Sequence, residues 1–87
     1  QENINYVDER NDLLVAKLKN MNKSFTQKEL KICELIYLNF SSKEIADKLN
    51  ISKETIKWYR KRIRKKLNLK RGEKLFLRLN KIILEIS

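Results

Sequence analysis

The feature that most constrains the fold is the short distance between two stretches of helical periodicity, residues 42–49 and 53–67. Apolar or small residues recur at helical spacing in both stretches, at Ile45, Ala46, Leu49, Ile56, Tyr59 and Ile63. Only Asn50, Ile51 and Ser52 lie between them, so no further element fits and the two helices must cross at a steep angle. Asparagine tolerates the positive φ angle of such a turn, and serine is a preferred N-cap. The pattern predicts a helix-turn-helix, although an ordinary helical hairpin would show it too.

The second of these helices is strongly basic. Residues 52–67 contain eight Lys or Arg among sixteen residues. Residues 52–74 hold eleven Lys or Arg against Glu54 and Glu73, which leaves +9 of the net charge of +10. Cations so close together on one helix repel one another and destabilise it unless a partner neutralises them. The face opposite the apolar stripe carries Lys53, Lys57, Trp58 and Lys61. Such a face points to a polyanion, either nucleic acid or an anionic membrane surface, and favours the helix-turn-helix over a plain hairpin.

Composition excludes several other classes. At 87 residues the chain can bury one modest core, and an apolar content of 41% without proline predicts an all-α domain. A single cysteine, Cys33, which we expect to be buried, and no histidine argue against an internal disulfide and a zinc site. We expect no metal and no cofactor. Without a glycine-rich phosphate loop or clustered carboxylates, we expect no enzyme. No apolar run is long enough to cross a membrane, which predicts a cytoplasmic protein.

Two further helices are expected before this pair. The first covers residues 4–21, and the residues on its apolar side are Ile4, Val7, Leu14, Leu18 and Met21. The second starts after Thr26, which forms a capping box with Glu29 three residues later. It stops at Asn39, because asparagine accepts the left-handed conformation of a helix C-terminus. Phe40 is then expected to turn into the core.

A last helix is expected over residues 73–86, after a loop that contains the only glycine of the chain, Gly72. One apolar stripe of this helix consists of Leu75, Leu79, Ile82 and Ile86, and a second consists of Phe76, Leu77, Ile83 and Leu84. A surface helix of a small domain needs only one stripe for packing. The second stripe therefore predicts a homodimer, or else a contact with the N-terminal helix.

Residues 25–67 read FTQKELKICELIYLNFSSKEIADKLNISKETIKWYRKRIRKKL. This stretch resembles the DNA-binding domain of LuxR-type bacterial transcription regulators. It follows the family pattern without a gap at Thr26, Glu29, Ile32, Cys33, Ile45, Ala46, Leu49, Ile51, Ser52, Thr55, Ile56, Ile63, Lys66 and Leu67. The resemblance implies a tetrahelical helix-turn-helix domain at residues 25–87. Residues 1–24 would add an N-terminal helix that links it to an upstream sensor or receiver domain, as in a response regulator or another signal-transduction protein.

The resemblance also implies that the basic helix enters the major groove of double-stranded DNA. The residues that match base-reading positions are Lys57, Trp58 and Lys61. Lysine can reach guanine O6 and N7, and an indole can press on a thymine methyl. Contacts with backbone phosphates are expected from further polar and cationic residues at the start and on the sides of the helix, namely Ser52, Lys53, Thr55, Arg60, Arg62, Lys65 and Lys66, and Arg64 could contribute another.

Some of these side chains could make contacts within the protein instead of binding DNA. Trp58 could lie over neighbouring lysine side chains or contact another protomer. Arg64 or Lys66 could pair with Glu29 or Glu34. These alternatives concern single residues, whereas the mutual repulsion of eight cations on one helix still calls for a polyanionic partner.

Two other functions compete with this prediction. A sigma-factor-like promoter-binding domain shares the architecture, but the start at Phe25 and Thr26 and the end at Lys66 and Leu67 follow the LuxR-type pattern closely. A basic amphipathic helix could also bind a protein or a membrane surface. However, Trp58 is the lone large apolar residue on the cationic face, so little of this helix could insert into a bilayer.

Overall fold

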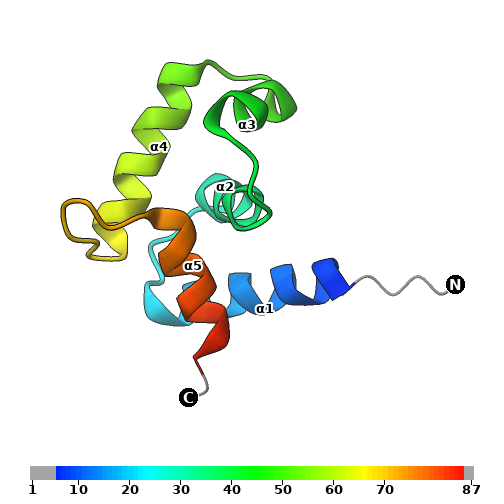
Figure 1. Ribbon diagram of the computed structural model, residues 1–87, viewed down its shortest axis with the longest axis vertical. Helices are drawn as coiled ribbons and strands as arrows, with labels where there is room; N and C mark the ends of the chain where they lie inside the picture. The colour runs from blue at the N-terminus through cyan, green and yellow to red at the C-terminus, as the bar shows by residue number, and fades with distance from the viewer. Residues whose placement is uncertain (1–5, 86–87) are drawn as a thin grey trace, which may run out of the picture.

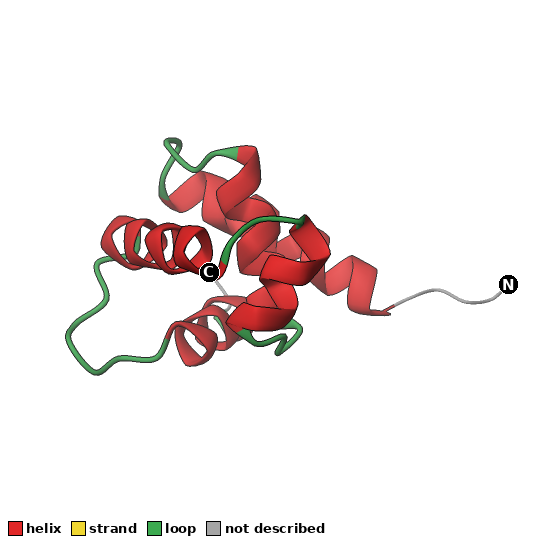
Figure 2. Ribbon diagram, turned by 90° about the horizontal axis from the view of Figure 1, so that it is seen from above, coloured by secondary structure: helices red, strands yellow, loops and turns green. Residues whose placement is uncertain are grey.

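The computed structural model describes residues 6–85, which form helices joined by short loops (Figure 1). The helices are α1 (Tyr6–Met21), α2 (Gln27–Tyr37), α3 (Ser42–Leu49), α4 (Lys53–Lys66) and α5 (Leu75–Leu84). Residues 6–85 contain no strand, so the prediction of an all-α fold is confirmed (Figure 2). Ile4, Ile86 and the side chain of Val7, which we expected on the apolar stripes of the end helices, lie outside the described part of the chain.

Hydroxyl side chains begin the three middle helices. Thr26 and Glu29 form the predicted capping box of α2: the Glu29 amide donates to Thr26 Oγ1 at 3.1 Å, and the Thr26 amide donates to Glu29 Oε1 at 2.9 Å. Ser41 caps α3 in the same way with the help of Glu44. Ser52 caps α4 by accepting a hydrogen bond of 3.0 Å from the Thr55 amide.

Asparagines with positive φ angles end the same three helices. Asn39 (φ 71°) follows α2 and Asn50 (φ 56°) follows α3, as predicted, and Asn68 (φ 55°) does the same after α4. In each case the amide of the next residue donates to a carbonyl five residues back, at 3.0 to 3.1 Å; the pairs are Phe40 with Leu35, Ile51 with Ala46, and Leu69 with Arg64. This is the Schellman motif. The apolar residue after each asparagine packs against the core, which fixes the direction in which the chain leaves the helix.

Helix α2 lies at the centre of the domain (Figure 1). Helices α3 and α4 pack on one side of it and form the predicted helix-turn-helix, while α1 and α5 pack on the other side and against each other (Figure 1). The core contains fully buried residues from all five helices of this region, namely Leu14, Leu18, Ile32, Cys33, Ile45, Ile56, Ile63, Leu75 and Leu79. Because α1 and α5 pack behind α2, they leave the outer face of α4 uncovered.

Helix α1 is tied to α5 by packing and by a helix cap. Leu14 and Leu18 are fully buried, and Lys17 Nζ donates to the carbonyl oxygens of Ile82 at 3.2 Å and Glu85 at 2.5 Å. A cation at these carbonyls also interacts favourably with the dipole of α5. The expectation that Met21 faces the core is wrong, because this residue ends α1 beside the C-terminus of α5 and is 53% exposed.

Helix α5 is shorter than the predicted span of residues 73–86. Lys74 has an extended backbone (φ −90°, ψ 131°) and forms no side-chain cap, so the helix starts at Leu75. Glu73 belongs to the loop instead: Glu73 Oε1 accepts a hydrogen bond of 2.8 Å from the Lys70 amide, and Oε2 pairs with Arg78. None of the helices in the described region is both long enough and apolar enough to span a membrane.

Candidate nucleic-acid interface

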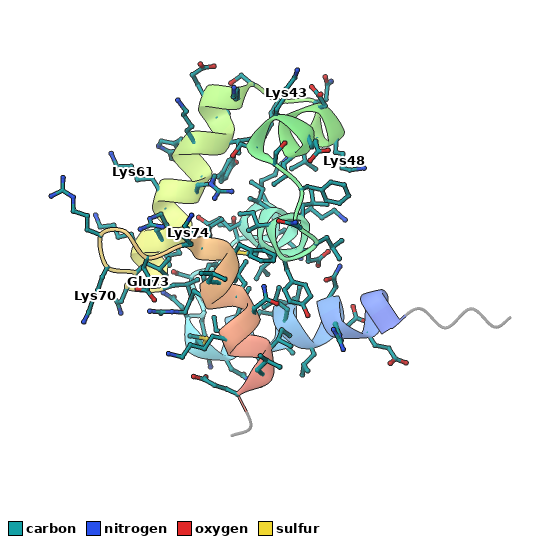
Figure 3. All side chains as sticks on the ribbon, viewed as in Figure 1. Lys43, Lys48, Lys61, Lys70, Glu73 and Lys74 are labelled. Carbon is teal, nitrogen blue, oxygen red and sulfur yellow. The ribbon has the colours of Figure 1, made fainter. Side chains whose placement is uncertain are left out.

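The outward face of α4 is exposed and cationic. Ile56 and Ile63 are fully buried on the inner side of the helix. The opposite side presents the exposed residues Lys53, Glu54, Lys57, Trp58, Lys61 and Lys65. Lys61 projects away from the rest of the domain (Figure 3). The three residues expected to read bases, Lys57, Trp58 and Lys61, are thus all on the accessible side of the helix.

The N-terminus of α4 adds hydroxyl groups and a helix dipole to this face. Ser52 Oγ lies 2.8 Å from Thr55 Oγ1, in addition to capping the Thr55 amide. Ser52 is exposed and Thr55 is half-buried. A helix N-terminus carries unpaired amides and a partial positive charge, which suits it to binding a phosphate group.

One flank of α4 is anchored to a buried carboxylate. Glu29 is fully buried, and its Oε1 atom accepts a hydrogen bond of 2.5 Å from Lys66 Nζ as well as the one from Thr26. Its Oε2 atom accepts a hydrogen bond of 3.0 Å from Arg62 Nε. Lys66 also donates to the Ser24 carbonyl at 2.7 Å. The carboxylate therefore joins the start of α2 to the second half of α4.

These hydrogen bonds bear on the two predictions made for Lys66, an ion pair within the domain and a phosphate contact. The ion pair with Glu29 is confirmed. The predicted phosphate contact is not supported, because the Lys66 side chain is only 15% exposed and its ammonium group is already bound by Glu29 and Ser24. Lys66 is therefore a structural residue of this domain, and we remove it from the set of phosphate contacts.

The ion pairs of Glu29 control its protonation. Burial by itself would raise the pKa of the Glu29 carboxyl, but hydrogen bonds from Lys66, the Thr26 amide and Arg62 outweigh it and hold the pKa below the ordinary value of 4.5. Glu29 is consequently ionised at neutral pH, and its charge stabilises the folded state.

This lowered pKa predicts loss of stability in acid. The folded state binds the Glu29 proton less readily than the unfolded state does, so the stabilisation is complete above pH 4.5 and is lost as the pH falls through the folded-state pKa. Glu29→Gln should lower the free energy of unfolding at neutral pH by about 2 kcal/mol or more, because it leaves Lys66 without an anionic partner. The difference between variant and wild type should then shrink toward acid pH.

Urea unfolding of both proteins between neutral and acid pH would test this. Hydrogen bonds from backbone amides lower the pKa of Glu44 and Glu73 as well, and the comparison cancels their effect because both proteins keep these residues. A stability difference that stays constant with pH would contradict the prediction.

Trp58 is held between two neighbours on this face. Its ring meets the Tyr59 ring edge-on, with centroids 5.0 Å apart and an interplanar angle of 77°. The Arg62 guanidinium carbon lies 4.8 Å from the centroid of the Trp58 ring. Trp58 nevertheless remains 53% exposed, so much of its indole is available to a partner.

The arginines on the other flank of α4 are partly engaged in contacts within the domain. Arg64 donates to the carbonyl oxygens of Glu73 at 2.6 Å and Lys70 at 3.1 Å. Of the two residues expected as alternatives to pair with Glu29 or Glu34, Lys66 forms the ion pair and Arg64 does not. Arg60 is half-buried, and this burial, followed by repulsion from Arg64, lowers its pKa. Arg60 is thus less accessible to a phosphate than the lysines of the outward face.

Cys33 is fully buried in α2, as expected. Burial, reinforced by the negative charges of Glu29 and Glu34, raises the pKa of its thiol to about 12. Cys33 is therefore a packing residue without thiolate reactivity at neutral pH. Within residues 6–85, no group of three or more Cys, Asp or Glu residues is placed to hold a metal ion.

The loop between α4 and α5 extends the basic surface. Lys70, Arg71 and Lys74 are exposed, and Lys70 lies on the same side of the domain as Lys61 (Figure 3). The hydrogen bonds that Arg64 and Glu73 make within this loop hold it beside the end of α4. The charge of these residues is visible in the sequence, but their contacts depend on how the loop folds, and no role had been predicted for them.

The four residues of the second apolar stripe of α5 divide into two pairs. Phe76 and Ile83, predicted as part of a free stripe, are half-buried against the core. Leu77 and Leu84 are 59% and 77% exposed and lie seven residues apart, on the same face of the helix. The candidate dimer surface is therefore reduced from four residues to Leu77 and Leu84.

The fold and the exposed cationic face of α4 define a DNA-binding domain of the helix-turn-helix class. The family model of bacterial regulatory proteins of the LuxR family matches residues 23–77, and the chain therefore belongs to this family. The resemblance seen in the sequence is confirmed, and the chain is a DNA-binding transcription regulator domain; members of the family are regulators rather than enzymes. No curated protein and no solved structure matches the chain. Helix α1 lies outside the matched residues.

Proposed function

We propose that this domain binds double-stranded DNA in a sequence-specific manner, with α4 in the major groove. The observation that carries this proposal is the outward face of α4, which is exposed and cationic while both terminal helices pack behind α2. Lys57, Trp58 and Lys61 lie on the N-terminal and central part of this face and would contact base edges.

Phosphate contacts would surround the base-reading residues. On α4, the cations assigned to phosphates are Lys53, Arg62 and Lys65, and half-buried Arg60 would contribute less to phosphate binding. The loop between α4 and α5 would add Lys70 and Arg71. Ser52 and Thr55 would hold one phosphate at the N-terminus of α4. Such contacts fix the register of the protein on the duplex, while the base contacts discriminate between sequences.

The chain would act as the effector domain of a bacterial response regulator or a similar signalling protein. A sensor or receiver domain upstream of α1 would supply the input, and the protein would work in the cytoplasm. Because α1 packs against α2 and α5 through buried Leu14 and Leu18, it belongs to the core of the DNA-binding unit and would pass a displacement on to α5.

A direct comparison of two polyanions tests the function. The purified 87-residue chain is mixed at low salt with random duplex DNA in a gel-shift assay and with anionic phospholipid vesicles in a sedimentation assay. We expect a duplex complex and little vesicle binding, because the outward face offers only one large apolar residue, Trp58, for insertion. Binding to vesicles without binding to duplex would refute the proposal and favour a membrane-surface module.

The family match over residues 23–77 disfavours the sigma-factor-like promoter-binding role that was considered from the sequence. Recovery of genomic fragments by the purified domain distinguishes the two, since a sigma-like domain would recover fragments that share a common promoter element. A transcription regulator would instead recover a small set of operators. The recovered operator also provides the specific duplex for the experiments below.

We further propose that the domain dimerises on DNA through α5, with Leu77 and Leu84 of two protomers in contact. Leu77→Lys should abolish the dimer and reduce affinity for a duplex with two half-sites by about a hundredfold, because the two binding events are no longer linked. Affinity for a single half-site should stay the same. Leu13→Lys, which replaces an exposed leucine of α1, is the matched control. Equal behaviour of the two variants in sedimentation and gel-shift assays would exclude this dimer.

A further inference from the structure

The buried carboxylate of Glu29 is connected to an exposed side chain of the DNA-binding face. Glu29 lies in the first turn of α2, whereas Trp58 lies on the outward face of α4. Arg62 links them: its Nε atom donates to Glu29 Oε2 at 3.0 Å, and its guanidinium carbon lies 4.8 Å from the centre of the Trp58 ring. This link is distinct from the hydrogen bond that Lys66 makes to the other oxygen, Glu29 Oε1.

We propose that Glu29 is a positioning residue for DNA reading, which acts through Arg62 to hold the Trp58 indole in one orientation on the surface of α4. This inference rests on the proposed function, since it assumes that Trp58 contacts the DNA. It adds a role for a buried residue that itself cannot reach a base.

The side chain of Glu29 is fixed in position. Its carboxylate is fully buried, and Oε1 accepts a hydrogen bond from the Thr26 amide in the capping box. A buried carboxylate in a capping box has little freedom to rotate, even without the additional hydrogen bond from Lys66. It therefore presents Oε2 to α4 in a constant direction.

Arg62 is restrained by its hydrogen bond to Glu29. An exposed arginine normally samples many rotamers, but a hydrogen bond from Nε to a fixed acceptor restrains the whole planar guanidinium group. Arg62 follows Trp58 by four residues and so lies beside it on the same face of α4. The Arg62 side chain is 44% exposed, so its remaining N–H groups can still reach a phosphate.

Trp58 is in turn oriented by Arg62 and Tyr59. A tryptophan on an exposed helix face would otherwise choose among several staggered rotamers, and selecting one on binding costs conformational entropy. Here the Tyr59 ring meets it edge-on and Arg62 meets its face. The indole is thus oriented before DNA arrives, and less entropy is lost when it contacts a base.

The test uses Trp58 as its own probe, because it is the only tryptophan of the chain. Acrylamide quenching of its fluorescence is measured on the free 87-residue chain, and affinities are measured for the recovered operator and for random duplex. The variants are Glu29→Gln, which weakens the acceptor, and Arg62→Lys, which keeps the charge but removes Nε and the guanidinium plane. Lys66→Gln is the matched control, because it removes the ion pair at Oε1 and leaves the hydrogen bond to Arg62 in place.

We expect stronger quenching of Trp58 in Glu29→Gln and Arg62→Lys than in wild type, but not in folded Lys66→Gln. The ratio of operator to random-duplex affinity should fall about two- to fivefold in the first two variants, which is the factor that a cation–π contact supplies at an exposed site. Arg62→Lys removes no buried charge, so it remains informative even if Glu29→Gln is too unstable to measure.

Unchanged quenching in Arg62→Lys would overturn the inference. Quenching that rises as much in Lys66→Gln as in Glu29→Gln would overturn it as well, because the effect would then reflect general loosening of the domain. Failure of the wild-type chain to bind any duplex would refute the proposed function instead, and the quenching of the free protein would still decide whether Glu29 orients Trp58.

Discussion

Lys61→Ala is expected to lower the affinity for the operator about five- to 150-fold more than the affinity for random duplex. Lys61 is exposed at the middle of the outward face of α4 and projects away from the domain (Figure 3). A good side-chain contact with a base edge contributes roughly 1–3 kcal/mol of discrimination, which corresponds to this range of affinity ratios. Loss of a phosphate contact would weaken both complexes alike.

The matched control for Lys61→Ala is Lys48→Ala. Lys48 is also exposed, but it lies on the opposite side of the domain, on α3 beside Phe40 (Figure 3). Both variants remove one positive charge, so a general electrostatic effect would be similar in the two. Gel-shift titrations with operator and random duplex measure the ratio. Equal losses on both duplexes for Lys61→Ala would show that this residue contacts the backbone and does not read bases.

Much of the fold follows from local chemistry that is visible in the sequence. Thr26 and Ser52 start their helices because a hydroxyl can accept a hydrogen bond from an amide two or three residues ahead, and Asn39 and Asn50 end theirs because asparagine accepts a positive φ angle. These interactions involve residues close together in the chain, so the sequence was sufficient. Asn68 obeys the same rule, and an Asn followed by an apolar residue could have been recognised there too.

The hydrogen-bond partners of Lys66 and Arg64 and the burial of Phe76 could not be predicted from local sequence in this way. Lys66 and Arg64 are neighbours on a helix rich in cations, and their partners are a carboxylate 37 residues earlier and carbonyl groups of the following loop. Long flexible side chains can reach either a solvent-facing phosphate or such internal acceptors. Phe76 is half-buried because of the way in which α5 docks onto the core, which a helical periodicity does not reveal. In each case tertiary packing decided the outcome.

A strong salt dependence of DNA binding is the second large effect that we expect. The cations available for phosphates are Lys53, Arg62, Lys65, Lys70 and Arg71, with Arg60 as a partly buried sixth. Neutralisation of about six phosphates should reduce affinity by roughly a thousandfold or more between 50 and 200 mM salt, because condensed counterions are released from the duplex. The effect should be similar for operator and random duplex, since phosphate contacts carry no sequence information.

Single substitutions show how much each cation contributes to this salt dependence. Arg71→Ala should make the slope of log affinity against log salt less negative by about one, because a phosphate contact from the loop between α4 and α5 is lost. Lys66→Gln should leave the slope unchanged, because Lys66 is bound to Glu29 and Ser24 inside the domain. Fluorescence anisotropy titrations at several salt concentrations measure both slopes. A wild-type slope no steeper than about −2 would mean that few phosphates are neutralised, and that the cations of α4 have another partner.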